Sequence, residues 1–216
     1  MARILCGIPC FRLADQVLRC LLSLNCSAVD VLAIDNAADA DVKQVLGTFE
    51  RSGRVRVIHS PTNEYCNGGW NRILEQGITK GYDLIGIGSS DVILGAGWHE
   101  VLVSRADAVT DEVWLPRIGE AAGDIEYIHG GVAGFFTFLP RKAAELVYPI
   151  PRGLKMWFGD EYMFSKVRAA GYKVTILNAL KAQHEWSSVT AATPEAYTVI
   201  EQDKIEWQRL NSDANR

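Results

Sequence analysis

Residues 3–36 read RILCGIPCFRLADQVLRCLLSLNCSAVDVLAIDN and carry the first part of an alternating strand and helix pattern. Arg3 to Ile8 and Val29 to Ile34 are short, largely apolar runs with β-branched residues, which is typical of buried parallel strands. Between these runs, apolar residues recur at helical spacing, at Leu13, Val17, Leu21 and Leu24. This stretch therefore predicts a β-α-β unit.

The alternation continues to about residue 95 and loosens after Trp98. The apolar patterns predict helices over 41–49 and 70–76, and strands over 55–58 and 84–87. In the second half we expect strands at 112–115 and 173–177, a hairpin through 124–128, an apolar run over 132–139, and helices starting near residues 98, 141, 160 and 194. Strands that alternate with helices predict an α/β fold with an open, mostly parallel sheet and flanking helices.

Composition excludes several classes of protein. The 216 residues include 22 Lys and Arg and 26 Asp and Glu, a net charge of −4 without a long run of one sign, which disfavours a surface built to hold nucleic acid. The longest apolar run, Val132 to Leu139, is far shorter than the roughly 18 residues of a transmembrane helix. Ile4 to Cys10 is interrupted by Gly7 and Pro9, unlike the core of a signal peptide. The five cysteines lack zinc-ligand spacing, so we expect free thiols in a cytoplasmic chain without a transmembrane segment.

Polar residues follow each expected strand of the first half. In open α/β sheets the ligand crevice lies beyond the carboxyl ends of the strands. Pro9 to Arg12, Asp35 and Asn36, His59 to Asn63, and Ser89 to Asp91 all fall at such ends. We therefore expect one crevice to gather these four groups.

Two glycine-containing segments are candidates for phosphate binding. Residues 67–71, Asn-Gly-Gly-Trp-Asn, are expected to open a helix whose backbone N–H groups can receive phosphate oxygens. Residues 86–91 partly resemble a dinucleotide fingerprint, but Asp91 stands where the third glycine belongs and the segment closes a strand instead of opening the first helix. The sequence also has no Gly-Lys-Ser/Thr phosphate loop, so a dehydrogenase and a P-loop ATPase are both disfavoured.

The order of these segments, from near the N-terminus to about His184, resembles the family 2 glycosyltransferases of the GT-A fold. Gly7 to Arg12 is similar to their opening strand, with its proline followed two residues on by an aromatic residue. Asp35 to Asp39 is similar to their Asp-Asp-x-Ser-x-Asp turn, and Asn63 to Asn71 to their Asn-x-Gly-x-x-x-x-x-Asn region. Gly81 to Val92 resembles the G-x-D-x-x-x-x-L-N-P-D-V form of the rhamnosyltransferase-like branch.

The second half continues the resemblance. Gly159 to Val174 is similar to the family's E-D-x-D-L…R-x-x-G-Y-x-V pattern, in which Asp160 takes the place of the catalytic base. Gly159 and Tyr162 replace the two flanking acids of that pattern. Asp91 falls on the last acidic position of the family's metal motif, whose first acid is replaced by Ser89, and His184 matches a histidine that faces the metal or the phosphates.

The resemblance implies a metal-dependent glycosyltransferase that moves a sugar, with inversion, from a UDP- or dTDP-linked donor to an acceptor hydroxyl. It implies a single domain over 1–216, with a nucleotide-sugar half (1–95) and an acceptor and catalytic half (96–216). The acceptor could be a glycan, a lipid-linked sugar, a small molecule or a modified nucleobase. The residues assigned in this way are Pro9, Phe11, Asp35, Asn67 and Asn71 for the donor, Asp91 and His184 for Mn²⁺ or Mg²⁺, and Asp160 for the acceptor proton. From their positions beside Asp160 and His184, Trp157 and Phe158 could contact the acceptor and Trp186 could cover the donor, with a place in the core as the alternative.

Two other functions stay open at this point. A nucleotidyltransferase that activates a sugar phosphate has a similar α/β scaffold, but it normally has a glycine-rich basic loop after the first strand, and Pro9 to Arg12 contains no glycine. A non-catalytic nucleotide-sugar-binding protein is suggested by Ser89 and Gly159, which stand where acids are usual.

Overall fold

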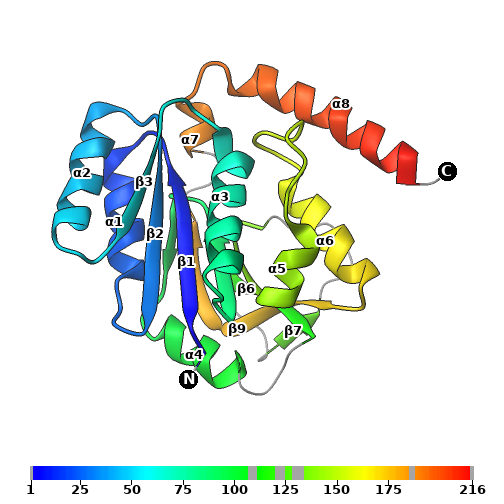
Figure 1. Ribbon diagram of the computed structural model, residues 1–216, viewed down its shortest axis with the longest axis horizontal. Helices are drawn as coiled ribbons and strands as arrows, with labels where there is room; N and C mark the ends of the chain where they lie inside the picture. The colour runs from blue at the N-terminus through cyan, green and yellow to red at the C-terminus, as the bar shows by residue number, and fades with distance from the viewer. Residues whose placement is uncertain (1, 107–110, 120–124, 128–133, 185–187, 215–216) are drawn as a thin grey trace.

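The computed structural model describes residues 2–106, 111–119, 125–127, 134–184 and 188–214, and its core is one mixed β-sheet covered by helices (Figure 1). The strands are β1 (Ile4–Cys10), β2 (Val29–Asn36), β3 (Arg56–Ser60), β4 (Leu84–Gly88), β5 (Val92–Leu94), β6 (Glu112–Ile118), β7 (Ile125–Tyr127), β8 (Phe136–Pro140) and β9 (Lys173–His184). The helices are α1 (Ala14–Leu24), α2 (Ala40–Arg51), α3 (Tyr65–Thr79), α4 (Trp98–Ala106), α5 (Arg141–Val147), α6 (Gly159–Ala169), α7 (Ser188–Ala191) and α8 (Ala196–Ala214).

The sheet has the strand order β3-β2-β1-β4-β8-β6-β9-β5, and β7 pairs with β9 outside this path. The first four strands are parallel, as the β-α-β pattern predicts. In the second half, β8 runs antiparallel to β4 and β6, while β6 and β9 are parallel. The predicted α/β fold with flanking helices is therefore confirmed, and one continuous sheet runs through both halves of the chain.

Each face of the sheet is covered by its own set of helices because side chains alternate along the strands. Ile4, Cys6 and Ile8 of β1 pack in one cluster with apolar residues of α1, α2 and α4. Leu5, between them, packs in a second cluster with residues of α3, α5 and α6. Figure 1 shows α3 and α5 on the face of the sheet opposite to α1.

The glycines of β4 serve the packing of aromatic rings. A Cβ atom on Gly88 would lie 2.2 Å from the Phe136 ring, and one on Gly86 would lie 2.8 Å from the Phe138 ring. Both phenylalanines are fully buried in β8, the antiparallel neighbour of β4. The partial resemblance of residues 86–91 to a dinucleotide fingerprint thus reflects close packing between two strands.

Several predicted boundaries are wrong. Helix α3 begins at Tyr65, five residues before the predicted start, and β9 extends to His184 where the pattern predicts an end at Leu177. Strand β5 was not predicted, because three residues are too few for a periodic pattern. The expected hairpin through 124–128 lies only partly within the described residues, as β7.

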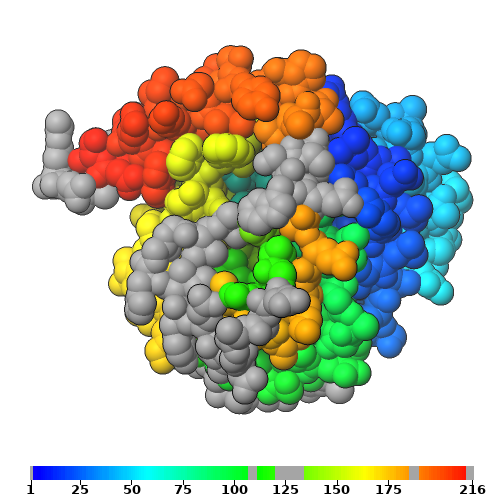
Figure 2. Space-filling view, turned by 180° about the vertical axis from the view of Figure 1, so that it is seen from behind, coloured from blue at the N-terminus to red at the C-terminus, as the bar shows by residue number. Residues whose placement is uncertain are grey.

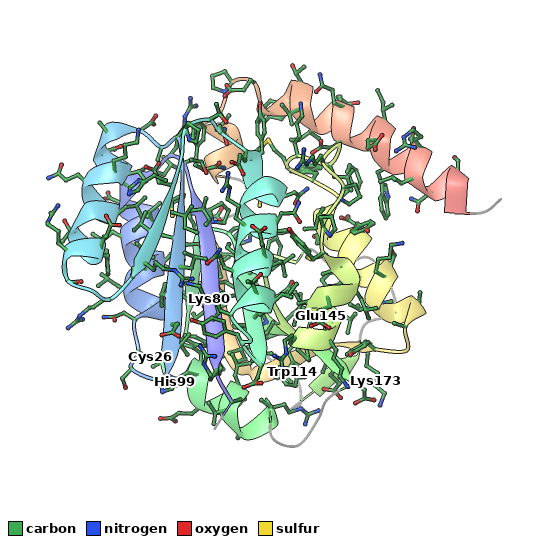
Figure 3. The ribbon with its side chains drawn as sticks, viewed as in Figure 1. Cys26, Lys80, His99, Trp114, Glu145 and Lys173 are labelled. Carbon is green, nitrogen blue, oxygen red and sulfur yellow. The ribbon has the colours of Figure 1, made fainter. Side chains whose placement is uncertain are left out.

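The carboxyl ends of the parallel strands face the side of the molecule where α7 and the start of α8 lie (Figure 1). Lys80, Glu145 and Lys173 lie in the lower half of the same view, away from that edge (Figure 3). From behind, α8 extends past the body of the molecule toward the C-terminus (Figure 2). None of the helices in the described part of the chain has the length and hydropathy needed to span a bilayer.

Candidate active site

A cavity of about 430 Å³ lies at the carboxyl ends of β1, β2 and β4. It gathers residues from all four of the strand-end groups singled out in the sequence, namely Pro9 and Phe11, Asn36, Asn63, and Ser89 to Asp91. Tyr65, Cys66 and Trp70 of α3 also line the cavity. The second half of the chain supplies the other walls, with the residues just before β8, the loop before α6, the start of α6, the end of β9, α7 and the segment after α7. Its residues on the wall are Gly134, Phe135, Met156, Trp157, Phe158, Asp160, Glu161, His184, Thr190 and Thr193.

Pro9 and Phe11, both predicted donor residues, line the cavity at the end of β1. A Cβ atom on Gly69 would lie 2.6 Å from the Pro9 Cβ atom, so glycine at this position of α3 allows the helix to approach β1 closely. The Arg12 guanidinium lies 4.8 Å from the centre of the Phe11 ring and donates a hydrogen bond to the carbonyl of Ala192. The chain between α7 and α8 is thereby attached beside the end of β1.

Asp35, another predicted donor residue, is buried behind the cavity wall. Its Oδ1 atom accepts a hydrogen bond from the Ala38 N–H at 2.9 Å, and its Oδ2 atom lies 2.8 Å from the His59 Nδ1 atom. This hydrogen bond with the Asp35 carboxylate raises the pKa of His59. The next residue, Asn36, lines the cavity instead and bonds to the backbone of Glu64 and Tyr65.

Asn67 and Asn71 hold a loop of the second half and do not line the cavity. The Asn67 side chain donates to the carbonyls of Leu154 at 3.1 Å and Trp157 at 3.2 Å. The Asn71 amide exchanges two hydrogen bonds with the backbone of Ile150, at 2.9 and 2.7 Å. Because α3 begins earlier and the Asn67 N–H donates to the Lys155 carbonyl at 2.9 Å, the prediction of a helix terminus open to phosphate at this segment is wrong.

Asp91 and His184, the predicted metal ligands, lie together on the cavity wall. They meet because β5, which starts at Val92, pairs antiparallel with β9 so that Val92 faces His184 across the ladder. The His184 Nε2 atom lies 3.4 Å from the Asp91 Oδ1 atom, and both side chains are buried. The Phe135 ring lies 4.0 Å from the imidazole, centre to centre, and covers it on one side.

The donor chemistry of this pair fits a divalent ion that is only partly held by protein. A carboxylate and an imidazole suit Mn²⁺, whereas Mg²⁺ prefers oxygen ligands and keeps more of its water. Within the described residues no group of three or more His, Cys, Asp or Glu side chains could hold a metal ion. An ion between Asp91 and His184 would therefore need further ligands from phosphate oxygens and water.

Asp160 and Glu161 form a carboxyl pair that lines the same cavity, at the start of α6. Asp160 accepts hydrogen bonds from the Gly134 N–H at 2.7 Å and from the Glu161 N–H at 3.1 Å. Burial, a hydrogen bond to Asp160 and the Asp160 charge raise the pKa of Glu161 to about 8. The pair therefore holds a proton near neutral pH.

The sequence identified Asp160 but missed Glu161 as a cavity residue. Successive residues point about 100° apart around a helix, so two neighbouring carboxylates need not face the same cavity. In the structure both residues line the cavity. An adjacent second carboxylate was the one signal in the sequence that could have found it.

Gly159 is explained by packing. A Cβ atom on Gly159 would lie 2.2 Å from the Asn67 Oδ1 atom, so an acid at this position would collide with the amide that holds the neighbouring loop. The preceding residue, Phe158, has a left-handed backbone with φ of 61°. The absence of the expected acid is thus the consequence of a close contact between α3 and the start of α6.

The loop before α6 supplies aromatic side chains. Trp157 is 46% exposed and lines the cavity, and the Phe158 ring stacks on Trp207 of α8 with centres 6.0 Å apart. Trp186, which was assigned to the donor, lies outside the described residues.

The charge of the cavity is acidic. Its described lining contains the carboxyl groups of Asp91, Asp160 and Glu161 but no Lys or Arg. Burial and the charges of Asp91 and Asp160 also raise the pKa of the Cys66 thiol in this wall, which keeps the thiol neutral. An anionic diphosphate would be repelled by such a wall unless a cation accompanied it.

No protein-family model and no curated protein sequence matches this chain. Solved structures of GT-A glycosyltransferases have a similar fold. GalNAc-T7 with UDP, GalNAc and Mn²⁺ is 13% identical with a TM-score of 0.67, over 85% of this chain and 43% of that protein. Staphylococcus aureus TarS, residues 1–349, is 11% identical with a TM-score of 0.66, over 84% and 60%. The mannosyltransferase PcManGT of Pyrobaculum calidifontis, with GDP-Man and Mn²⁺, is 11% identical with a TM-score of 0.63, over 85% and 56%.

At these identities the similarity shows the fold. This chain matches 43%, 60% and 56% of the lengths of those three chains, less than two thirds of each. The GT-A fold expected from the sequence motifs is confirmed by these similarities.

Proposed function

We propose that this protein is a metal-dependent glycosyltransferase that moves a sugar from a UDP- or dTDP-linked donor to an acceptor hydroxyl with inversion. The observation that carries the proposal is that the Asp91 and His184 pair and the Asp160 and Glu161 pair line the same cavity. The similar folds of structures solved with UDP and Mn²⁺, or with GDP-Man and Mn²⁺, support it. We also propose the division into a nucleotide-sugar half (1–95) and an acceptor half (96–216), and the rhamnosyltransferase-like branch on the basis of residues 81–92.

In this proposal the nucleoside lies at the end of the cavity formed by Pro9, Phe11, Asn36 and Asn63. The apolar faces of Pro9 and Phe11 would contact the base, because a planar ring buries the most surface against such faces. Asp35 does not line the cavity; its hydrogen bonds to Ala38 and His59 hold the turn after β2 in its conformation at this end of the cavity. Asn67 and Asn71 position the opposite wall through the loop that they bind.

Asp91 and His184 are the residues that would hold Mn²⁺ or Mg²⁺. When bound, such an ion would neutralise the diphosphate and polarise it as a leaving group. Asp91 contributes the negative charge of the site, and His184 is held in place by the β5–β9 pairing and by Phe135. Ser89 stands beside them with a hydroxyl in place of the family's first acid, which leaves a single carboxylate on this wall.

Asp160 takes the proton of the acceptor hydroxyl as that oxygen attacks the anomeric carbon from the face opposite the diphosphate, and a single displacement inverts the configuration. The N–H groups of Gly134 and Glu161 orient its carboxylate. A positioned general base contributes about 10²- to 10⁴-fold to the rate. Glu161, protonated near neutral pH, stabilises the charged form of Asp160 by a hydrogen bond until the proton is transferred.

A non-catalytic nucleotide-sugar-binding protein is the second candidate, because Ser89 and Gly159 replace acids of the family pattern. The contact between Gly159 and Asn67 weakens this candidate, since it gives a structural reason for the loss of one acid.

Donor hydrolysis distinguishes the two functions. The purified protein is incubated with UDP-, dTDP- and GDP-linked sugars, with Mn²⁺ or with EDTA, and released nucleotide is measured. We expect Mn²⁺-dependent release from a UDP- or dTDP-sugar that is lost in Asp160→Asn. Binding of the nucleotide sugars without release, in the presence of simple glycoside acceptors, would identify a binding protein and overturn the proposed transferase.

A further inference from the structure

The loop that forms one wall of the cavity, residues 150–158, lies between two helices that are far apart in the sequence (Figure 1). On one side, Asn71 and Asn67 of α3 bind the backbone of Ile150, Leu154 and Trp157. On the other side, α8 covers the loop. The loop carries Trp157 and leads directly into the first turn of α6, where the carboxyl pair lies.

Asp203 of α8 is the centre of the second contact. The residue is fully buried, and its carboxylate accepts three hydrogen bonds from consecutive backbone N–H groups of the loop. The Oδ1 atom accepts from Lys155 at 2.8 Å, and the Oδ2 atom accepts from Met156 at 2.6 Å and from Trp157 at 2.8 Å. Burial of a carboxylate costs free energy unless hydrogen bonds replace those lost with water. The buried Asp203 carboxylate is therefore stable only while the N–H groups of residues 155–157 stay bonded to it.

Two further contacts bring α8 and the loop together. A Cβ atom on Gly153 would lie 2.7 Å from the Glu206 Oε1 atom, so the Glu206 side chain of α8 lies against the backbone of the loop. The Trp207 ring, one turn after Asp203, stacks nearly parallel on Phe158 with an interplanar angle of 14°. The residue after Phe158 is the first residue of α6, and Asp160 follows it. The contact of Trp207 with Phe158 therefore links α8 to the turn of helix that carries Asp160.

We propose that Asp203 is a positioning residue for the acceptor side of the active site. It fixes Lys155 to Trp157 as the wall on which the acceptor binds and, through Phe158, the first turn of α6 that carries Asp160. This inference rests on the proposed glycosyltransferase function. It assigns a role to α8, which lies outside the part of the sequence that resembles the family.

The position requires a group that only accepts hydrogen bonds. Asparagine has nearly the size of aspartate but presents an NH₂ group on one side, and that group would face an N–H of the loop without an acceptor between them. Asp203→Asn should therefore release part of the loop without leaving a cavity. Glu201→Gln is the matched control, because it removes an exposed carboxylate from the same helix without touching the loop.

The experiment measures three quantities on the full chain. Amide hydrogen exchange of residues 150–158 reports the loop, calorimetry with UDP and Mn²⁺ reports the donor site, and UDP-glucose and UDP-N-acetylglucosamine hydrolysis reports turnover. In Asp203→Asn we expect exchange at 155–157 to accelerate about tenfold or more, since an opened hydrogen bond exchanges through local unfolding. Turnover should fall by about 10²-fold, because displacement of a catalytic group by about 1 Å costs that much, while the Kd of UDP and the KM of the donor change less than about twofold.

The possible outcomes separate this inference from the proposed function. Absence of nucleotide release by the wild-type protein from every UDP- and dTDP-sugar of the panel would overturn the proposed function, whereas the exchange rates and the ratio of variant to wild-type turnover test Asp203. Unchanged exchange, or accelerated exchange with unchanged turnover, would overturn the positioning role. If Asp203→Asn does not fold, Trp207→Leu removes the half-buried ring from Phe158 without exposing a buried charge, and the same pattern of faster exchange and lower turnover is expected.

Discussion

Replacement of Asp160 by asparagine is the most direct test of the proposed chemistry. Asparagine keeps the shape of the side chain but cannot take the acceptor proton, so turnover should fall by about 10²- to 10⁴-fold, which corresponds to about 3 to 5 kcal/mol of transition-state stabilisation. The structure also predicts a cost in stability. The two carboxylate oxygens accept from the N–H groups of Gly134 and Glu161. Asparagine has one oxygen that can accept, and its NH₂ group would face the other N–H as a second donor, which costs about 1 to 3 kcal/mol.

The assay separates these two effects. Turnover is measured by nucleotide release well below the melting temperature, and the free energy of unfolding by urea denaturation. Binding of UDP with Mn²⁺, followed by calorimetry, should stay within about twofold of the wild-type value, because the proposed ion is held by Asp91 and His184 and Asp160 acts only on the acceptor proton. An ordinary residue at a helix start would show the loss of stability and keep turnover.

Glu161→Gln is the matched variant for Asp160→Asn. In the wild-type protein the pair should give the pH profile of turnover a limb near pH 8, where Glu161 loses its proton, and Glu161→Gln should remove that limb while retaining much of the activity at neutral pH. If Glu161→Gln abolishes turnover and Asp160→Asn remains active, then Glu161 is the base and the reasoning on Asp160 is refuted.

Three further predictions follow from the same cavity. The raised pKa of Glu161 means that the folded protein binds more protons than the unfolded chain between about pH 4.5 and 8, so the stability of the fold should decrease as the pH rises through this window. Glu161→Gln should make this decrease smaller and should have a higher melting temperature than the wild type at pH 8.5. If the melting temperatures of variant and wild type depend on pH in the same way, the assignment is contradicted. Asp91→Ala should weaken Mn²⁺-dependent UDP binding more than His184→Ala does, because the carboxylate supplies the charge, and titration calorimetry showing no change in Asp91→Ala would remove it from the site. Gly159→Ala should destabilise the fold by about 1 to 3 kcal/mol, because the added methyl group would collide with the Asn67 side chain. A denaturation midpoint equal to that of the wild type would contradict this prediction.

Some features of this protein were determined by the sequence. Strand and helix periods are local properties, so the alternation in residues 3–87 predicted the order of the first four strands and their helices. The same alternation predicted a crevice at the strand ends, and Pro9, Phe11, Asp91, Asp160 and His184 do line one cavity. The order of the residues was sufficient to predict the position of the crevice, because short right-handed connections leave parallel strands few alternative arrangements.

The tertiary structure decided what the polar side chains near the cavity do. Asn67 and Asn71 fall in a donor-like motif, yet their amides bind the backbone of a loop about 80 to 90 residues away. Asp35 bonds inside its own turn and to His59, and Glu161 lines the cavity together with Asp160.

Asp203 shows most clearly why these roles could not be predicted. In the sequence it is one acid in a polar helix, and only the docking of α8 against the loop places three N–H groups around its carboxylate. Periodicity reports which face of an element is apolar, whereas the partner of a polar group depends on which distant segment arrives beside it. Which segment comes to lie beside a polar group depends on the packing of the whole core. The sequence therefore determined the order of strands and helices, and the tertiary structure determined the partners of the polar side chains at the site.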